Sequence, residues 1–278
     1  QYPEKVCVVC AIQTKATTKQ FYTSKYKILS DIYNLMSKKI GLFWLRDDFR
    51  ITKNHGLAEA TKNHDQVVVF YLYKKSIFKN QEAQKWWLSK SLFNFKKKLN
   101  NFNIALEIIE TESFEVFFDK LLKKKDISIY WNKVYEPDYL KFDQHLLKNL
   151  KIKNIFYGIF KGNTLNEISE IKKSDGTPFK VFTPFWRNAE KHYIEKIPSK
   201  EKIIKKCLRK KNYFQNCINA DEILPKKKWF KNFEKIWLPD EESALKELKI
   251  FIKNRIVNYS DDRNFPNKIG TSKLSPFI

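Results

Sequence analysis

Glycine is scarce in this sequence. The chain has six glycines in 278 residues, and none of them forms a G-x-G-x-x-G or G-x-x-x-x-G-K pattern behind a strand-like segment. Those patterns let backbone amides hold the phosphates of a dinucleotide or a triphosphate. Their absence disfavours a stand-alone nucleotide-binding module, an alternative that nucleotide binding by residues 36–165 alone would support.

Cysteine and long apolar runs are also few. The four cysteines are Cys7, Cys10, Cys207 and Cys217, and only the first two have a C-x-x-C spacing. No second such pair follows, and the four histidines lack ligand spacing, so we expect no zinc site. The apolar run at residues 6–12 is too short to span a bilayer and has no signal-peptide layout. We therefore predict a cytoplasmic protein with free thiols.

Methionine occurs once. Met36 stands just before the first strand-like segment, whereas the chain begins with Gln1. This arrangement predicts that residues 1–35 are a non-native or disordered extension, with the natural start at Met36. Such an extension should pack poorly against the rest of the chain.

Acidic residues are outnumbered by basic ones. The 54 Lys and Arg residues against 31 Asp and Glu residues give a formal net charge of +23. This excess favours a polyanionic partner, because surface cations displace the counterions of nucleic acid phosphates. The excess is mostly lysine and accompanies many Asn, Ile and Phe residues, a usage that an AT-rich genome also produces. Charge alone therefore gives weak support for DNA binding.

Strand-like and helix-like segments alternate from residue 38 to about residue 160. This alternation predicts βαβ units in an α/β domain over residues 36–165, with a five-stranded, parallel, doubly wound, Rossmann-like sheet. The predicted strands are residues 40–45, 67–73, 104–109, 128–131 and 154–157, and the predicted helices are residues 56–62, 83–100, 113–123 and 137–150.

The alternation stops after Phe160. Glycine and proline punctuate residues 166–239, which predicts a long interdomain linker, and its basic stretch at 191–235 is expected to be a solvated loop. Asp240 and two glutamates then precede an apolar helical pattern. Acidic residues suit the positive end of a helix, so residues 240–278 are predicted to begin an all-α domain.

Four ordered segments resemble the DNA photolyase/cryptochrome family. They are residues 44–50 (WLRDDFR), 131–137 (WNKVYEP), 176–187 (GTPFKVFTPFWR) and 259–275 (YSDDRNFPNKIGTSKLS). Within the first, Arg46, Asp48 and Arg50 are expected to hold a turn by salt bridges. The third is an aromatic linker expected to pack between two domains. The match is closest to bacterial class I cyclobutane pyrimidine dimer photolyases, of which this chain resembles an N-terminal fragment.

The resemblance implies a light-driven DNA repair lyase that uses reduced FAD and acts on UV-damaged DNA as a monomer. Carried over by position, Arg263 corresponds to a contact with DNA phosphate. The residues that correspond to flavin contacts are Tyr259, Thr271, Ser272, Lys273, Leu274 and Ser275. No catalytic residue is expected in this stretch, which is predicted to be inactive alone. The alternative within the family is a cryptochrome, a blue-light photoreceptor without repair activity.

The family also uses antenna chromophores, commonly near the segment that follows Trp131. Asp138 and Tyr139 stand where folate-binding members have Asn-Glu, and residues 74–84 contain no counterpart of their folate-contacting histidine. A folate antenna is therefore disfavoured. A deazaflavin, another flavin or no antenna remain open.

Overall fold

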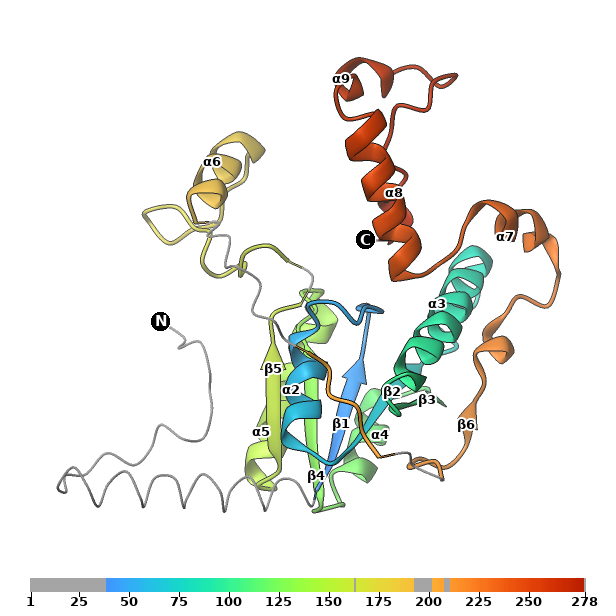
Figure 1. Cartoon of the computed structure of the whole chain (residues 1–278). Helices are drawn as coiled ribbons and strands as arrows, with labels where there is room; N and C mark the ends of the chain where they lie inside the picture. The colour runs from blue at the N-terminus through green and yellow to red at the C-terminus, as the bar shows by residue number, and fades with distance from the viewer. Residues whose placement is uncertain (1–38, 163, 193–201, 208–210, 278) are drawn as a thin grey trace.

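The computed structural model describes residues 39–162, 164–192, 202–207 and 211–277 (Figure 1). The predicted extension at residues 1–35 lies outside the described residues. The five predicted parallel strands are all present, in the order β5-β4-β1-β2-β3. They are β1 (Ile40–Leu45), β2 (Gln66–Tyr73), β3 (Ala105–Glu110), β4 (Ile127–Asn132) and β5 (Phe156–Phe160).

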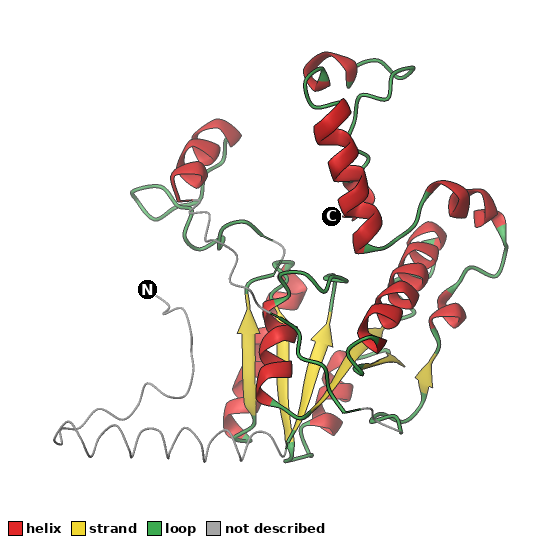
Figure 2. Ribbon diagram, in the orientation of Figure 1, coloured by secondary structure: helices red, strands yellow, loops and turns green. Residues whose placement is uncertain are grey.

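Helices cover both faces of this sheet, as the doubly wound prediction requires (Figure 2). The helices that follow the first four strands are α2 (His55–Asn63), α3 (Glu82–Asn100), α4 (Phe114–Leu121) and α5 (Pro137–Ile152). One buried cluster joins α2 and α3 to one face of the sheet, and a second joins α4 and α5 to the other. Because both faces are covered, the central strands are continuous apolar runs rather than alternating ones.

Asparagine fixes the start of two strands. Asn103 and Asn154 adopt left-handed φ angles of 57° and 51°. The next residue in each case, Ile104 or Ile155, donates its N–H back to the last turn of α3 or α5, to Leu99 O (3.1 Å) and Leu150 O (3.0 Å). Helices often end in this left-handed conformation. The predicted strands therefore begin one residue too early at β3 and two too early at β5.

A sixth strand, which the sequence prediction lacks, joins the edge of the sheet. β6 (Cys217–Ile218) runs antiparallel to β3. The buried Glu107 of β3 accepts hydrogen bonds from the backbone N–H groups of Tyr213 and Phe214, both at 2.7 Å. A two-residue strand is too short to show the alternation of apolar and polar residues that predicts a strand. β6 forms because the Glu107 side chain binds the backbone of the loop that precedes it.

The segment predicted as an irregular linker contains further regular structure. Its helices and turns are α6 (Phe182–His192), the 3-10 turns at Ala220–Ile223 and Trp229–Asn232, and α7 (Phe233–Ile236). α6 begins within the third family-like segment and has Pro184 in its first turn, a position that tolerates proline. Phe182 and Trp186 are exposed on it, so packing of this segment between two domains stays a prediction.

Beyond the linker, α8 (Glu241–Asn254) begins where the sequence predicts, and α9 (Tyr259–Asp262) follows it. Asp240 caps α8 by accepting the N–H of Ser243 at 2.7 Å. α8 contains no buried residue. In Figure 1, α6 and α8 both lie beyond the carboxyl ends of the parallel strands, on opposite sides.

Among the described residues, none of the helices combines the length and apolar character that crossing a membrane requires.

Glu107→Gln should lower the free energy of unfolding by about 1–3 kcal/mol, because an NH2 group replaces one of the two acceptor oxygens and faces an N–H donor, which leaves that donor unsatisfied. Urea denaturation measures the change. Glu110→Gln, at the exposed end of the same strand, is the matched control and should have little effect. Equal stability of the two variants would show that Glu107 does not hold the β6 loop.

Candidate functional site

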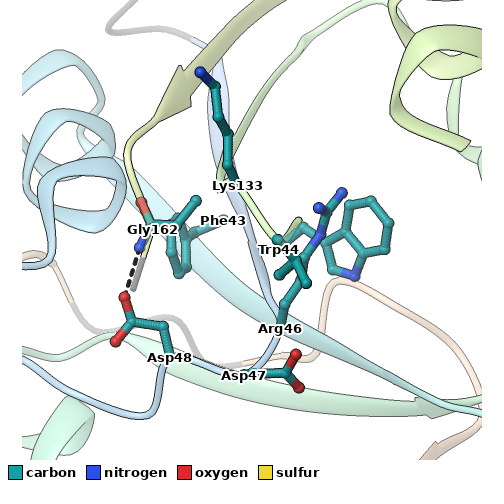
Figure 3. A pocket seen from close by; sticks show the side chains of 9 residues that line it. Phe43, Trp44, Arg46, Asp47, Asp48, Lys133 and Gly162 are labelled. Atoms are coloured by element: carbon teal, nitrogen blue, oxygen red, sulfur yellow. Dashed lines mark hydrogen bonds between the residues drawn. The ribbon is translucent and has the colours of Figure 1, made fainter. Parts of the chain in front are cut away.

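The carboxyl ends of β1 and β4 form the first candidate site. β1 pairs with β2 on one side and with β4 on the other, so the strand order reverses between β1 and β4. Ligands of open parallel sheets bind at such a reversal. A crevice lies here, lined by Phe43, Trp44, Arg46, Asp47, Asp48, Asn132, Lys133, Val134 and Gly162 (Figure 3).

Asn132 is the centre of the hydrogen bonds in this crevice. Its Nδ2 donates to Asp48 Oδ2 and to Asn54 Oδ1, both at 3.0 Å, and the first bond is the dashed line that ends on Asp48 in Figure 3. Its Oδ1 accepts the N–H of Gly56 at 3.2 Å. A Cβ at Gly56 would lie 2.6 Å from that oxygen, so only glycine fits there.

These contacts also use the N-terminus of α2, where a phosphate would bind in a dinucleotide-binding domain. Asn54 Oδ1 accepts the N–H of Leu57 at 3.1 Å, while Asn132 takes that of Gly56. The remaining cavity is about 10 Å³, room for about one water molecule. The geometry therefore gives no support to a nucleotide module at this edge of the sheet.

The two arginines after β1 form ion pairs with different aspartates: Arg50 with Asp48, and Arg46 with Asp143. Asp48 and Arg50 form the predicted ion pair, with Asp48 Oδ1 2.7 Å from Arg50 Nε. The prediction for Arg46 is wrong: its guanidinium is buried, lies 3.9 Å from the ring centroid of Trp44, and binds both carboxylate oxygens of Asp143 in α5. Arg46 therefore fixes α5 to β1 instead of holding the turn.

Burial changes the ionisation of two groups at this site. It raises the pKa of the Asp48 carboxyl, and the nearby Arg50 partly offsets the rise. Burial, with a contribution from the Asp47 carboxylate, raises the pKa of Tyr139 to about 12. Tyr139 therefore stays protonated at neutral pH. Within the described ranges, no three His, Cys, Asp or Glu side chains converge as a metal site.

The second candidate site is the C-terminal segment, where Tyr259 and Arg263 lie together. The Arg263 guanidinium is 5.4 Å from the Tyr259 ring centroid, and that ring meets Phe251 of α8 edge-on. Asp262 pairs instead with Lys268, at 2.6 Å. The exposed Arg263 is thus held by an aromatic ring and not by the neighbouring carboxylates, which leaves its charge available.

Residues 271–275 form one loop that folds back towards α9. Gly270 packs closely against Asp262, and the carbonyl oxygen of Thr271 accepts a hydrogen bond from Arg255 Nη1 at 3.2 Å. Ser272 Oγ accepts the N–H of Leu274, and Lys273 has a left-handed φ of 56°. A 3-10 turn, Ser275–Phe277, follows. The predicted contact residues therefore lie at α9 and in the loop that Gly270 holds against it, and their roles stay predictions.

Sequence reasoning missed the aromatic side chains that anchor the segment. Phe277 contacts Trp87 of α3, with ring centroids 5.2 Å apart, and Trp237 at 6.2 Å. Trp87 and Trp237 also contact each other at 6.1 Å. The adjacent tryptophans at 86 and 87 were the available signal, since paired indoles on an amphipathic helix require partners on two sides.

Comparisons with known proteins agree on one family. The family model described as DNA photolyase matches residues 41–202. The deoxyribodipyrimidine photo-lyase of Agrobacterium fabrum is 30% identical over 241 residues, which cover 85% of this chain and 50% of that protein. The chain therefore spans about half the length of the curated relatives it matches.

Two solved structures show the same fold. The crystal structure of a bacterial class III photolyase from Agrobacterium tumefaciens superposes with a TM-score of 0.73 at 29% identity, covering 86% of this chain and 50% of that one. A cryptochrome from Synechocystis gives a TM-score of 0.71 at 20% identity, with coverages of 86% and 52%. The predicted subclass, class I, stays a prediction beside a class III relative.

Arg50→Gln removes the cation that lowers the Asp48 pKa, so that pKa should rise further above its ordinary value. A folded-state pKa above the unfolded value means that the carboxylate subtracts stability as pH rises through the folded pKa. Relative to the wild type, Arg50→Gln should therefore lose more stability at a pH above the folded-state pKa of Asp48 than at a pH below its unfolded-state pKa. Carboxyl NMR titration and urea unfolding at several pH values measure both effects.

Lys53→Gln, which removes another cation from the same loop, is the control for this experiment. It should leave the titration of Asp48 near that of the wild type. If Arg50→Gln titrated like the wild type as well, Arg50 would not be the group that offsets the burial of Asp48.

Proposed function

Because this chain belongs to the DNA photolyase family, we propose that the protein is a light-driven DNA repair lyase that splits cyclobutane pyrimidine dimers. The observation that carries the proposal is the 30% identity with a deoxyribodipyrimidine photo-lyase over 85% of the chain. Its proposed cofactor is FAD and its proposed partner is UV-damaged DNA, bound by a cytoplasmic monomer.

The flavin phosphates are proposed to bind the loop of Thr271–Ser275, with Tyr259 as a further contact. The loop fits that part of FAD, since its hydroxyls and the exposed Lys273 can serve an anion. Reduced FAD, when bound, supplies the light-excited electron that splits the dimer and is then returned. The chain's own residues bind and orient, so the proposal needs no acid, base or nucleophile from this segment.

Arg263 is proposed to bind the DNA backbone. Its guanidinium is exposed and lies over Tyr259, while the nearby Asp262 is taken by Lys268. An exposed arginine whose charge is not neutralised locally can replace a phosphate counterion. This arrangement favours a phosphate contact over the local ion pair that the sequence allows.

An antenna chromophore does not fit the strand-end crevice in this arrangement. The free volume there is about 10 Å³, and Asn132, Asp48 and Asn54 satisfy one another across it. A folate antenna stays disfavoured on the sequence, and the identity of any antenna stays open. No step of the proposed function is assigned to one.

The second candidate is a cryptochrome-type photoreceptor, favoured by the shared fold of the Synechocystis cryptochrome. One experiment separates the two functions. The complete gene product is reconstituted with FAD, reduced, and mixed with an oligonucleotide that carries one cyclobutane dimer, in the dark or under blue light. Light-dependent loss of the dimer supports the lyase, whereas light-dependent changes in flavin absorption without dimer loss support the photoreceptor.

Residues 1–278 alone should not retain FAD, because the exposed loop reaches only the phosphates, and ligand pockets normally enclose most of the ligand surface. The absorption spectrum of the purified chain after gel filtration with excess FAD measures retention. A yellow protein with one flavin per chain would contradict the expectation. The positive control is the A. fabrum relative, from which flavin is first removed and to which the same excess of FAD is then added.

In the complete protein with FAD bound, Arg263→Ala should weaken the affinity for damaged and for undamaged duplex DNA to the same extent. The amount of FAD bound per chain should not change. The dependence of log K on log salt should become shallower by about one phosphate contact. Fluorescence anisotropy over a salt series measures both quantities. Wild-type affinity and slope for both duplexes would remove Arg263 from the DNA interface.

A further inference from the structure

Glu241, the first residue of α8, has a carboxylate that its own helix does not use. Asp240 already caps α8 through the N–H of Ser243. The Glu241 side chain is only 12% exposed, although glutamates in a first helical turn normally face solvent. Its position therefore calls for partners outside the helix.

Those partners are two consecutive backbone amides in the loop after β1. Glu241 Oε2 accepts the N–H of Ile51 at 2.9 Å, and Oε1 accepts that of Thr52 at 3.0 Å. The contacts join residues 190 and 189 positions apart in the sequence. Lys98 of α3 lies 3.8 Å from Oε2 and supplies a positive charge. One carboxylate thus joins the start of α8 to both the loop and α3.

The loop that receives Glu241 is itself fixed to the strand-end crevice. Arg50 pairs with Asp48, and Asp48 accepts a hydrogen bond from Asn132 at the end of β4. Asn54 Nδ2 donates to the carbonyl oxygen of Arg50 at 2.9 Å. The two amides therefore project from a loop that is anchored on both sides of them.

Apart from the ring contacts of Phe277 with Trp87 of α3 and with Trp237, which hold the far end of the C-terminal segment, α8 has little else to set its direction near its first residue. None of its residues is buried, and the bond from Asn94 Nδ2 to Pro239 O, at 3.2 Å, lies before the helix begins. Glu242 meets Lys98 at 3.4 Å, but its side chain is 82% exposed. A solvent-exposed ion pair of this kind contributes little.

We propose that Glu241 is a positioning residue that sets the direction of α8 from the loop after β1. Through α8 it places Tyr259, Arg263 and the loop of Thr271–Ser275 relative to the α/β domain. The importance of that placement for flavin and DNA rests on the proposed function. The contact itself is a property of this chain and needs neither ligand.

Glu241→Gln tests the proposal, with Glu242→Gln as the matched control of equal charge change one residue away. In a glutamine, an NH2 group replaces one of the two acceptor oxygens and faces one of the two N–H donors, so the paired contact is lost. Hydrogen exchange of the Ile51 and Thr52 amides should quicken about 10-fold or more in Glu241→Gln, since bonds to a charged acceptor are among the stronger ones. Glu242→Gln should leave both amides at the wild-type rate.

A spin-label distance reports on direction separately from local bonding. Labels replace the exposed Lys62 of α2 and Lys249 of α8, in a chain whose four cysteines are serine. The distance distribution should broaden or shift in Glu241→Gln and stay unchanged in Glu242→Gln, with the far-UV circular dichroism of all three chains alike. A lost bond without this shift would make Glu241 merely a local contact.

Two results would overturn the proposal. One is an unchanged distance distribution in Glu241→Gln. The other needs no variant: in the wild-type chain, the Ile51 and Thr52 amides would exchange as fast as free loop amides. Because these experiments contain no flavin and no DNA, either result would leave the proposed lyase function untouched, and failure of the repair assay would leave the positioning role untouched.

Discussion

The side-chain amide of Asn132 connects the parts of this structure that matter for its site. It stands at the end of β4 and bonds to the loop after β1 through Asp48, to the cap of α2 through Asn54, and to the first turn of α2 through Gly56. An amide can do this because it donates twice and accepts at the same time. The loop held in this way is the one that receives the start of α8.

The α/β domain was predictable because its signal is local and repeated. Five apolar runs of strand length alternate with four amphipathic segments, and both cores follow from that alternation. The errors lie where a single distant side chain decides. β6 depends on Glu107 of β3, more than 100 residues earlier in the chain, and a two-residue strand has no period to detect.

The candidate site also has a part that the sequence predicts and a part that depends on distant partners. Read in order, the family-like segments predict contact residues in the C-terminal segment, and that role stays a prediction. In the structure, Arg263 lies over Tyr259, and Gly270 before the Thr271–Ser275 loop packs against Asp262. Partners across the fold could not be read from spacing. Arg46 pairs with Asp143, 97 positions away. Arg263 contacts the ring of Tyr259 instead of the neighbouring carboxylates of Asp261 and Asp262.

The apolar stripe of α8 constrains how this sequence can change over time. Leu245, Leu248 and Ile252 keep a helical spacing within α8, yet each has at least 36% of its surface exposed. Polar replacements there would cost the described fold almost nothing, because surface substitutions rarely alter stability. Selection for folding alone would therefore let the stripe drift to polar residues. Its persistence as an apolar stripe would require selection for contact with another surface.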